Sequence, residues 1–182
     1  AGEIIFKDHS ISGEPSYKVA QSGLGLVPEG RQIFPNLSVY ENLIATASNR
    51  NNFQNPWSVE KIYSLFPALA ARQSNAGNQL SGGEQQMLSM SRALATKPAI
   101  LLLDELSMGL APIIVKQLYE IVAQIAEEGI AVLVVEQFAR TVLGVADTAG
   151  IMLNGQLVAE GLPTEIQHLL TSAYLGIKPN TL

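Results

Sequence analysis

The chain has 182 residues, of which 47% are hydrophobic and 15% charged, and its formal net charge is -5. This length fits one domain with a sizeable core, and the composition is typical of an ordered globular protein. The acidic balance gives no electrostatic reason to expect nucleic acid as a partner. Without cysteine the chain forms no disulfide and no thiolate metal site. No apolar run approaches the ~18 residues of a membrane-spanning helix, so any membrane role is expected to be peripheral.

The first half of the chain predicts short strands followed by helices. Ser38 with Glu41 three places on is a capping-box pattern, which predicts that a helix begins there. Residues 34–95 therefore indicate an inserted helical subdomain between two parts of a sheet core, 1–33 and 96–182. The other predicted elements are strands at 3–6 and 25–28 and helices at 17–22, 59–66 and 68–72.

Strands alternate with helices in the second half, which predicts an α/β fold. Two continuous apolar strands separated by a helix are typical of a parallel sheet that is buried on both faces. The pair Asn154-Gly155 between two strand-like runs indicates a β-hairpin. The predicted elements are strands at 100–104, 130–135, 148–153 and 156–160 and helices at 112–128, 137–145 and 163–170.

The run Ser81-Gly82-Gly83-Glu84 opens a predicted helix and has two interpretations. Ser81 with Glu84 is a capping box, which begins many helices. Two consecutive glycines, however, each cost about 1 kcal/mol relative to alanine in a helix. They are useful where backbone N–H groups approach a ligand closely, and a helix N-terminus with a free hydroxyl favours anions. The run alone does not decide between a structural cap and a phosphate site.

Asp104-Glu105 follows four aliphatic residues at the end of a predicted strand. Such a pair is often only two solvated acids. The functional alternative is that Asp104 binds Mg²⁺ and that Glu105 polarises an attacking water as general base. Lying shortly after the Ser81 run, the acid pair supports the functional interpretation of both.

Together these motifs resemble the nucleotide-binding subunits of ABC transporters, which implies a P-loop NTPase-like parallel sheet with an inserted α-helical subdomain. Residues 80–86 resemble the signature motif, 100–105 the Walker B strand and 107–110 the D-loop. Residues 27–34 and 134–137 are most similar to branched-chain amino acid uptake ATPases of the LivF type, with urea-uptake ATPases as a near alternative. The resemblance implies ATP and Mg²⁺ as cofactors.

The resemblance also implies residue roles. Ser81, Gly82 and Gly83 would bind the γ-phosphate of ATP held by a second, head-to-tail ATPase subunit. Glu29 stands where the family usually has the Q-loop glutamine, and Gln137 where it has the switch histidine; both replacements occur in LivF-like subunits. The implied set is Glu105 and Gln137 as catalytic residues, Ser81, Gly82, Gly83 and Gln85 as nucleotide-binding residues, Ser107 and Gly109 in the D-loop, Glu29 as the Q-loop equivalent and Asp104 on the metal.

The phosphate-binding Walker A pattern is absent, because no Gly-Lys pair occurs in the sequence. In the family that region lies upstream of the position at which this sequence begins, so the chain is expected to be a single ATPase domain lacking the N-terminal part of its core. By itself it is then expected neither to bind ATP in the usual cis manner nor to be more than marginally stable.

The expected partners are a second ATPase subunit and membrane-embedded permease subunits, with the chain peripheral on the inner, cytoplasmic face of the cell membrane. A non-hydrolysing module that only supplies its signature motif in trans is a second class. ABC-type proteins of chromosome maintenance are a third, but they carry long coiled-coil insertions, and residues 29–81 leave room only for a small helical subdomain.

Overall fold

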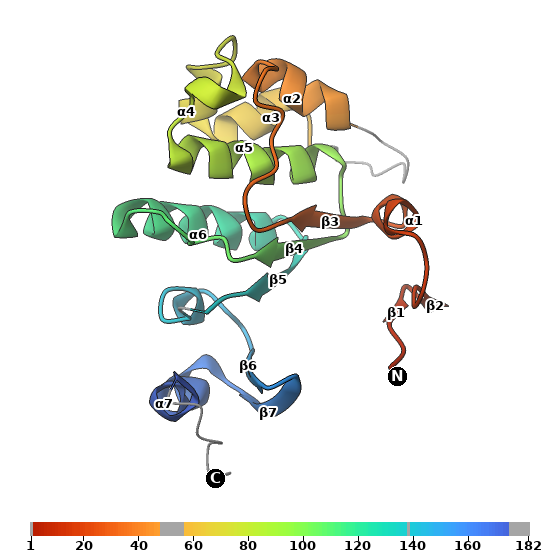
Figure 1. Cartoon of the computed structure of the whole chain (residues 1–182), viewed down its shortest axis with the longest axis vertical. Helices are drawn as coiled ribbons and strands as arrows, with labels where there is room; N and C mark the ends of the chain where they lie inside the picture. Colours follow the sequence, from red (N-terminus) through yellow and green to blue (C-terminus); the bar gives the residue numbers. More distant parts are fainter. Residues whose placement is uncertain (1, 48–56, 138, 175–182) are drawn as a thin grey trace.

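A three-stranded parallel sheet forms the centre of the molecule. The computed structural model describes residues 2–47, 57–137 and 139–174. The sheet has the order β3-β4-β5 (Figure 1), and its parallel register confirms the predicted α/β class. The strands are β3 (Leu24–Val27), β4 (Ile100–Asp104) and β5 (Ala131–Val135).

Helices cover one face of this sheet. Ser38 accepts a hydrogen bond from the Glu41 amide and begins a helix, as its capping box predicts. In the part of the chain that the structure describes, no helix is both long and apolar enough to cross a membrane. The helices next to the sheet are α5 (Gly82–Ala95) and α6 (Pro112–Glu127). The helices α2 (Val39–Thr46), α3 (Val59–Leu65) and α4 (Pro67–Ala70) pack on α5, on its side away from the sheet (Figure 1).

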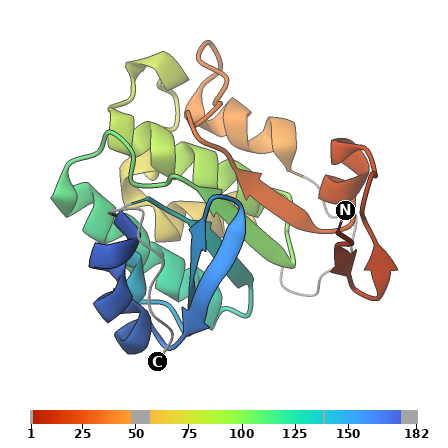
Figure 2. The ribbon, with the colours of Figure 1, turned by 60° about the horizontal axis from the view of Figure 1, so that its bottom comes forward.

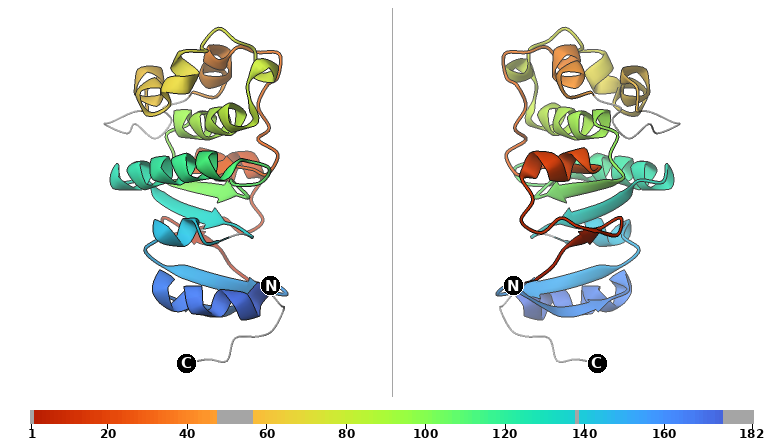
Figure 3. Two further views of the ribbon diagram at one scale, coloured as in Figure 1. Left: turned by 90° about the vertical axis from the view of Figure 1, so that its left-hand side faces the viewer. Right: turned by 90° about the vertical axis from the view of Figure 1, so that its right-hand side faces the viewer.

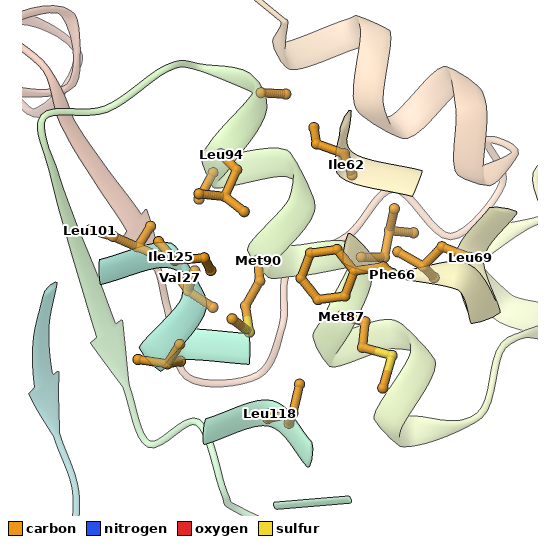
Figure 4. Close-up of a cluster of buried hydrophobic side chains, with 14 of the residues drawn as sticks. Val27, Ile62, Phe66, Leu69, Met87, Met90, Leu94, Leu101, Leu118 and Ile125 are labelled. Atoms are coloured by element: carbon orange, nitrogen blue, oxygen red, sulfur yellow. The ribbon is translucent and has the colours of Figure 1, made fainter. Parts of the chain in front are cut away.

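One hydrophobic core joins the helical layer to the sheet. Figure 4 shows Met90 and Leu94 of α5 between the strand residues Val27 and Leu101 and Phe66, which lies between α3 and α4. Because α5 contributes to both sides, the helical subdomain and the sheet share this core instead of having separate ones. The domain boundaries at residues 34 and 95 remain predictions.

Smaller units lie beside the central sheet. The Asn154-Gly155 hairpin is confirmed, since both residues have positive φ, as a tight hairpin turn requires. Figure 2 shows α1 and the first hairpin on one side of the sheet and α7 on the other, and Figure 3 shows α7 packed beside the second hairpin. The remaining elements of the structure are β1 (Ile5–Phe6), β2 (His9–Ser10), α1 (Ser16–Gln21), the 3₁₀ helices η1 (Gly77–Gln79), just before α5, and η2 (Val142–Gly144), β6 (Ala149–Leu153), β7 (Gln156–Gly161) and α7 (Pro163–Tyr174).

Two sequence predictions are wrong. The sheet is not buried on both faces: Leu26, Leu133 and Val135 are more than half exposed on the face turned away from α5 and α6. The helix predicted at 137–145 is, within the described residues, only the 3₁₀ turn η2. An apolar run predicts a strand, but it does not say which of the strand's faces is covered.

Candidate functional site

Polar residues from three separate segments meet at the carboxyl edge of the sheet. Glu29 follows β3, Asp104 ends β4 and Gln137 follows β5. The backbone N–H of Glu105 donates to the Val135 carbonyl at 3.0 Å, which continues the pairing of β4 with β5 by one residue. Parallel strands end at the same edge of their sheet, and ligands bind there in open α/β folds. The edge therefore brings together residues that lie far apart in sequence.

The carboxyl group of Glu105 has an unusual environment. Glu105 adopts a left-handed backbone conformation with φ of 50°. Burial and the nearby charge of Glu136 raise the pKa of its carboxyl group, a hydrogen bond from the Gln137 backbone opposes the rise, and the charges of Asp104 and Glu29 add to it. A carboxylate with a raised pKa is a stronger base. This environment suits the general-base role predicted for Glu105.

The described residues at this edge do not form a metal site from protein groups alone. Among the described residues, no three His, Asp or Glu side chains are grouped closely enough to hold a metal ion. Mg²⁺ commonly takes only one or two carboxylates and completes its octahedron with water and substrate phosphates. Asp104, at the end of β4, fits the role of such a single carboxylate ligand.

Ser81 begins α5 on the same side of the molecule. Its hydroxyl accepts from the Glu84 amide at 3.3 Å, and Glu84 accepts from the Ser81 amide at 2.8 Å, so the capping box is confirmed. Ser81 itself is exposed. In Figure 1, α5 runs opposite to β3 and β4, which puts its N-terminus at the edge where the strands end. Phosphate binding by this exposed turn remains a prediction.

The two glycines after Ser81 have a packing role that the sequence did not reveal. A Cβ on Gly83 would lie 2.8 Å from Cγ2 of Ile114 in α6, and one on Gly82 would lie 3.1 Å from the guanidinium of Arg31. Close approach of α6 therefore requires glycine at 83 whether or not a ligand binds there.

Gln85 uses its side chain within the protein. Its amide nitrogen donates to the carbonyls of Gly77 and Leu80 at 3.2 and 3.3 Å, and its oxygen accepts from Arg31 at 3.0 Å. These bonds fix the turn before α5 to the segment after β3. A direct contact of Gln85 with nucleotide remains a prediction.

The D-loop turn contacts a residue that the sequence analysis did not identify. Both the backbone N–H and the hydroxyl of Ser107 donate to the carboxylate of Glu136, at 2.8 and 2.9 Å. Gly109 supplies the positive φ of 70° that this turn needs, and Leu106 is buried in the core. The sequence could have marked Glu136 as a site residue, because it is a charged residue that directly follows an apolar strand and precedes Gln137.

Comparisons with known proteins agree with these motifs. The family profile described as ABC transporter matches residues 1–107. The chain is 39% identical over 180 residues to the high-affinity branched-chain amino acid transport ATP-binding protein BraG of Pseudomonas aeruginosa, covering 97% of this chain and 76% of BraG. It is 35% identical over 181 residues to the lipopolysaccharide export system ATP-binding protein LptB of Escherichia coli K12, covering 97% of this chain and 75% of LptB.

A solved structure shows the same fold. The ADP conformation of MJ1267, an ATP-binding cassette of an ABC transporter, superposes with a TM-score of 0.79 at 25% identity, covering 97% of this chain and 77% of MJ1267. The resemblance that rests on the signature and Walker B motifs is thereby confirmed. The chain belongs to the ABC transporter family, as one of its ATP-binding subunits with ATPase function.

Proposed function

We propose that this ATPase subunit drives the uptake of branched-chain amino acids. The observation that carries the proposal is the 39% identity to BraG over 97% of the chain. Residues 27–34 and 134–137, which resemble LivF-type ATPases, support the same subgroup. These two stretches lie at the ends of β3 and β5 and so contribute to the carboxyl edge.

In the proposed mechanism each residue at the edge has one task. Asp104 would be the protein ligand of Mg²⁺, and the ion would supply neutralisation of the negative charge on the phosphates of ATP. Glu105 takes a proton from the attacking water, and Gln137 contacts the γ-phosphate from the end of β5. The Ser81 hydroxyl and the amides of Gly82 and Gly83 stabilise the γ-phosphate of ATP held by a second subunit.

The geometry of the signature turn supports the second-subunit step. Ser81 is exposed, and α5 presents its N-terminus outward at the carboxyl edge. An exposed helix N-terminus favours an anion supplied from outside the chain. The proposed assembly is a head-to-tail ATPase dimer bound to membrane-embedded permease subunits at the inner face of the cell membrane.

A second candidate function is support of another transport system. LptB, named for lipopolysaccharide export, is 35% identical over nearly the same length, which is the observation in its favour. If the protein serves an importer, urea is an alternative solute. A subunit that supplies its signature motif in trans without hydrolysing ATP is the remaining mechanistic alternative.

One experiment separates these functions. The protein and its proposed permease partners are expressed in cells lacking their own branched-chain amino acid uptake. Entry of labelled leucine is then compared with entry of labelled urea. Leucine uptake that is lost in Glu105→Gln and kept in Glu120→Gln, whose carboxylate is exposed on α6, is the expected result. Unchanged uptake in Glu105→Gln would exclude the hydrolytic role, and absent leucine uptake in the wild type would exclude the proposed solute.

A further inference from the structure

Glu136 is a carboxylate on which three donors from two separate elements converge. The Ser107 amide donates to Oε1 at 2.8 Å, the Ser107 hydroxyl donates to Oε2 at 2.9 Å, and the Tyr119 hydroxyl donates to Oε1 at 2.5 Å. Ser107 lies in the D-loop turn, whereas Tyr119 lies in α6. The three residues span 29 positions of sequence, so the tertiary fold and not local geometry creates this cluster.

Hydrogen bonds, without a cation, hold this carboxylate in place. None of the ion pairs found among the described residues involves Glu136. Hydrogen bonds to an ionised acceptor are roughly twice as strong as neutral ones. Three of them on one part-buried carboxylate fix the Ser107 turn more firmly than a single surface contact would.

Tyr119 provides a rigid anchor for the cluster. Its side chain is 2% exposed, within the core formed by α5, α6 and the sheet. Burial first, and the hydrogen bond to Glu136 second, raise the pKa of the Tyr119 hydroxyl, so it remains a protonated donor at physiological pH. The carboxylate is thus attached to the immobile interior on one side and to an exposed turn on the other.

Glu136 connects this cluster to the residues at the carboxyl edge of the sheet. Glu136 stands between Val135, the last residue of β5, and Gln137, the switch position. The Gln137 backbone in turn lies close enough to the carboxyl group of Glu105 to oppose the rise of its pKa. The Ser107 turn and the backbone that carries Gln137 are therefore joined through the single carboxylate of Glu136.

We infer that Glu136 is a positioning residue that holds the D-loop turn and the switch residue Gln137 in one fixed arrangement, with Tyr119 as its anchor. The inference rests on the proposed ATPase mechanism, in which Gln137 contacts the γ-phosphate. Glu136 itself touches no reacting atom. Its contribution is the relative placement of two segments that must act together when ATP is hydrolysed.

Steady-state ATP hydrolysis by the assembled transporter tests the inference. In Glu136→Ala, Ser107→Ala and the double variant, kcat is expected to fall by about ten-fold while KM for ATP changes less than about two-fold. Because the two residues act through one contact, the double variant is expected to be no slower than the slower single variant. Glu120→Gln is the matched control for loss of a carboxylate.

Two more conservative variants separate a loss of positioning from a loss of folding. Glu136→Gln keeps an oxygen acceptor and is expected to recover most of the kcat lost in Glu136→Ala. Tyr119→Phe removes a single hydrogen-bond donor to Glu136. Its control is Tyr17→Phe, at an exposed site of α1. Hydrogen exchange of the 106–110 amides is expected to accelerate by about ten-fold in Glu136→Ala and to stay unchanged in Glu120→Gln.

The outcomes distinguish the two proposals. If Glu105→Gln abolishes hydrolysis but folded Glu136→Ala and Tyr119→Phe both keep the wild-type kcat, the positioning role of Glu136 is refuted and the ATPase mechanism stands. Multiplicative losses in the double variant likewise refute the inference. If Glu105→Gln leaves hydrolysis intact, the proposed mechanism fails, and only the exchange result then bears on the Glu136 contact.

Discussion

Alanine at position 83 would place a methyl group in space that α6 already occupies. The new Cβ falls 2.8 Å from Cγ2 of Ile114, closer than real Cβ contacts, and the β-branched side chain of isoleucine has few rotamers with which to move away. At Gly82 the new methyl group meets only the guanidinium of Arg31, the end of a flexible side chain, at 3.1 Å. We therefore expect Gly83→Ala to destabilise the chain and Gly82→Ala to be tolerated.

The magnitude follows from two opposing effects. Overpacking of a filled site costs about 1–3 kcal/mol, and replacement of glycine by alanine within a helix returns up to about 1 kcal/mol. The free energy of unfolding should thus fall by about 0–2 kcal/mol in Gly83→Ala. If Ile114 is first shortened to alanine the overlap disappears, so the coupling energy between the two sites should be about 1–3 kcal/mol.

Urea unfolding of the four proteins of the double-mutant cycle measures this coupling. The wild type, Gly83→Ala, Ile114→Ala and the double variant are compared, with Gly82→Ala as the control for an added methyl group in the same helical turn. Additivity of the two changes within about 0.5 kcal/mol would mean that a side chain at position 83 does not collide with Ile114. Equal destabilisation by alanine at 82 and 83 would refute the steric explanation as well.

Three further outcomes are expected. Ser81→Ala should lower the free energy of unfolding by about 1 kcal/mol, because the helix cap is lost. Ser81→Asn, in which asparagine also caps well, should keep stability but lower ATP hydrolysis by the assembled transporter. Full hydrolysis in Ser81→Asn would contradict the proposed phosphate contact of Ser81. Burial raises the pKa of Glu84, but hydrogen bonds from Ser81 and the charge of Arg72 outweigh burial and leave the pKa below its ordinary value. The ionised Glu84 therefore stabilises the fold at pH values above the ordinary carboxyl pKa, and this stabilisation is lost as pH falls through the lowered pKa. Arg72→Gln should therefore reduce stability at neutral pH and lessen the further loss on acidification, as unfolding at both pH values would show. Leu133→Thr on the exposed sheet face should reduce hydrophobic-dye binding and light scattering without loss of stability, while Val134→Thr, one residue on and packed against the core, should lower the unfolding midpoint.

Local chemistry explains which features the sequence predicts. The caps at Ser38 and Ser81 and the turn at Asn154-Gly155 depend on residues within three positions of one another, and all three are confirmed. The order of strands and helices follows from periodicity in the same local way. The acids at the carboxyl edge could be predicted as well, because parallel strands bring their ends together irrespective of the loops between them.

The sequence does not predict contacts between residues that lie far apart in the chain. The clash that requires glycine at 83 comes from Ile114, and the partner of Ser107 is Glu136, 29 positions away. Neither pairing leaves a periodic or compositional signal. The open face of β5 was missed for a related reason, since Leu133 and Val134 are equally apolar in sequence but point to opposite faces.

Two sets of long-range contacts give the site its internal connection. On one side, Ser89 and Gln85 of α5 bond to Arg31, through its carbonyl oxygen at 2.6 Å and its guanidinium at 3.0 Å, and so tie the segment after β3 to the signature helix. On the other side, Glu136 ties the segment after β5 to the D-loop turn that follows β4. Because β4 pairs with both neighbouring strands, Glu105 at its end lies between these two attachments. A shift of either outer segment is expected to change the surroundings of Glu105. Under the proposed mechanism, the geometry of hydrolysis is then expected to depend also on residues to which no contact with nucleotide is assigned.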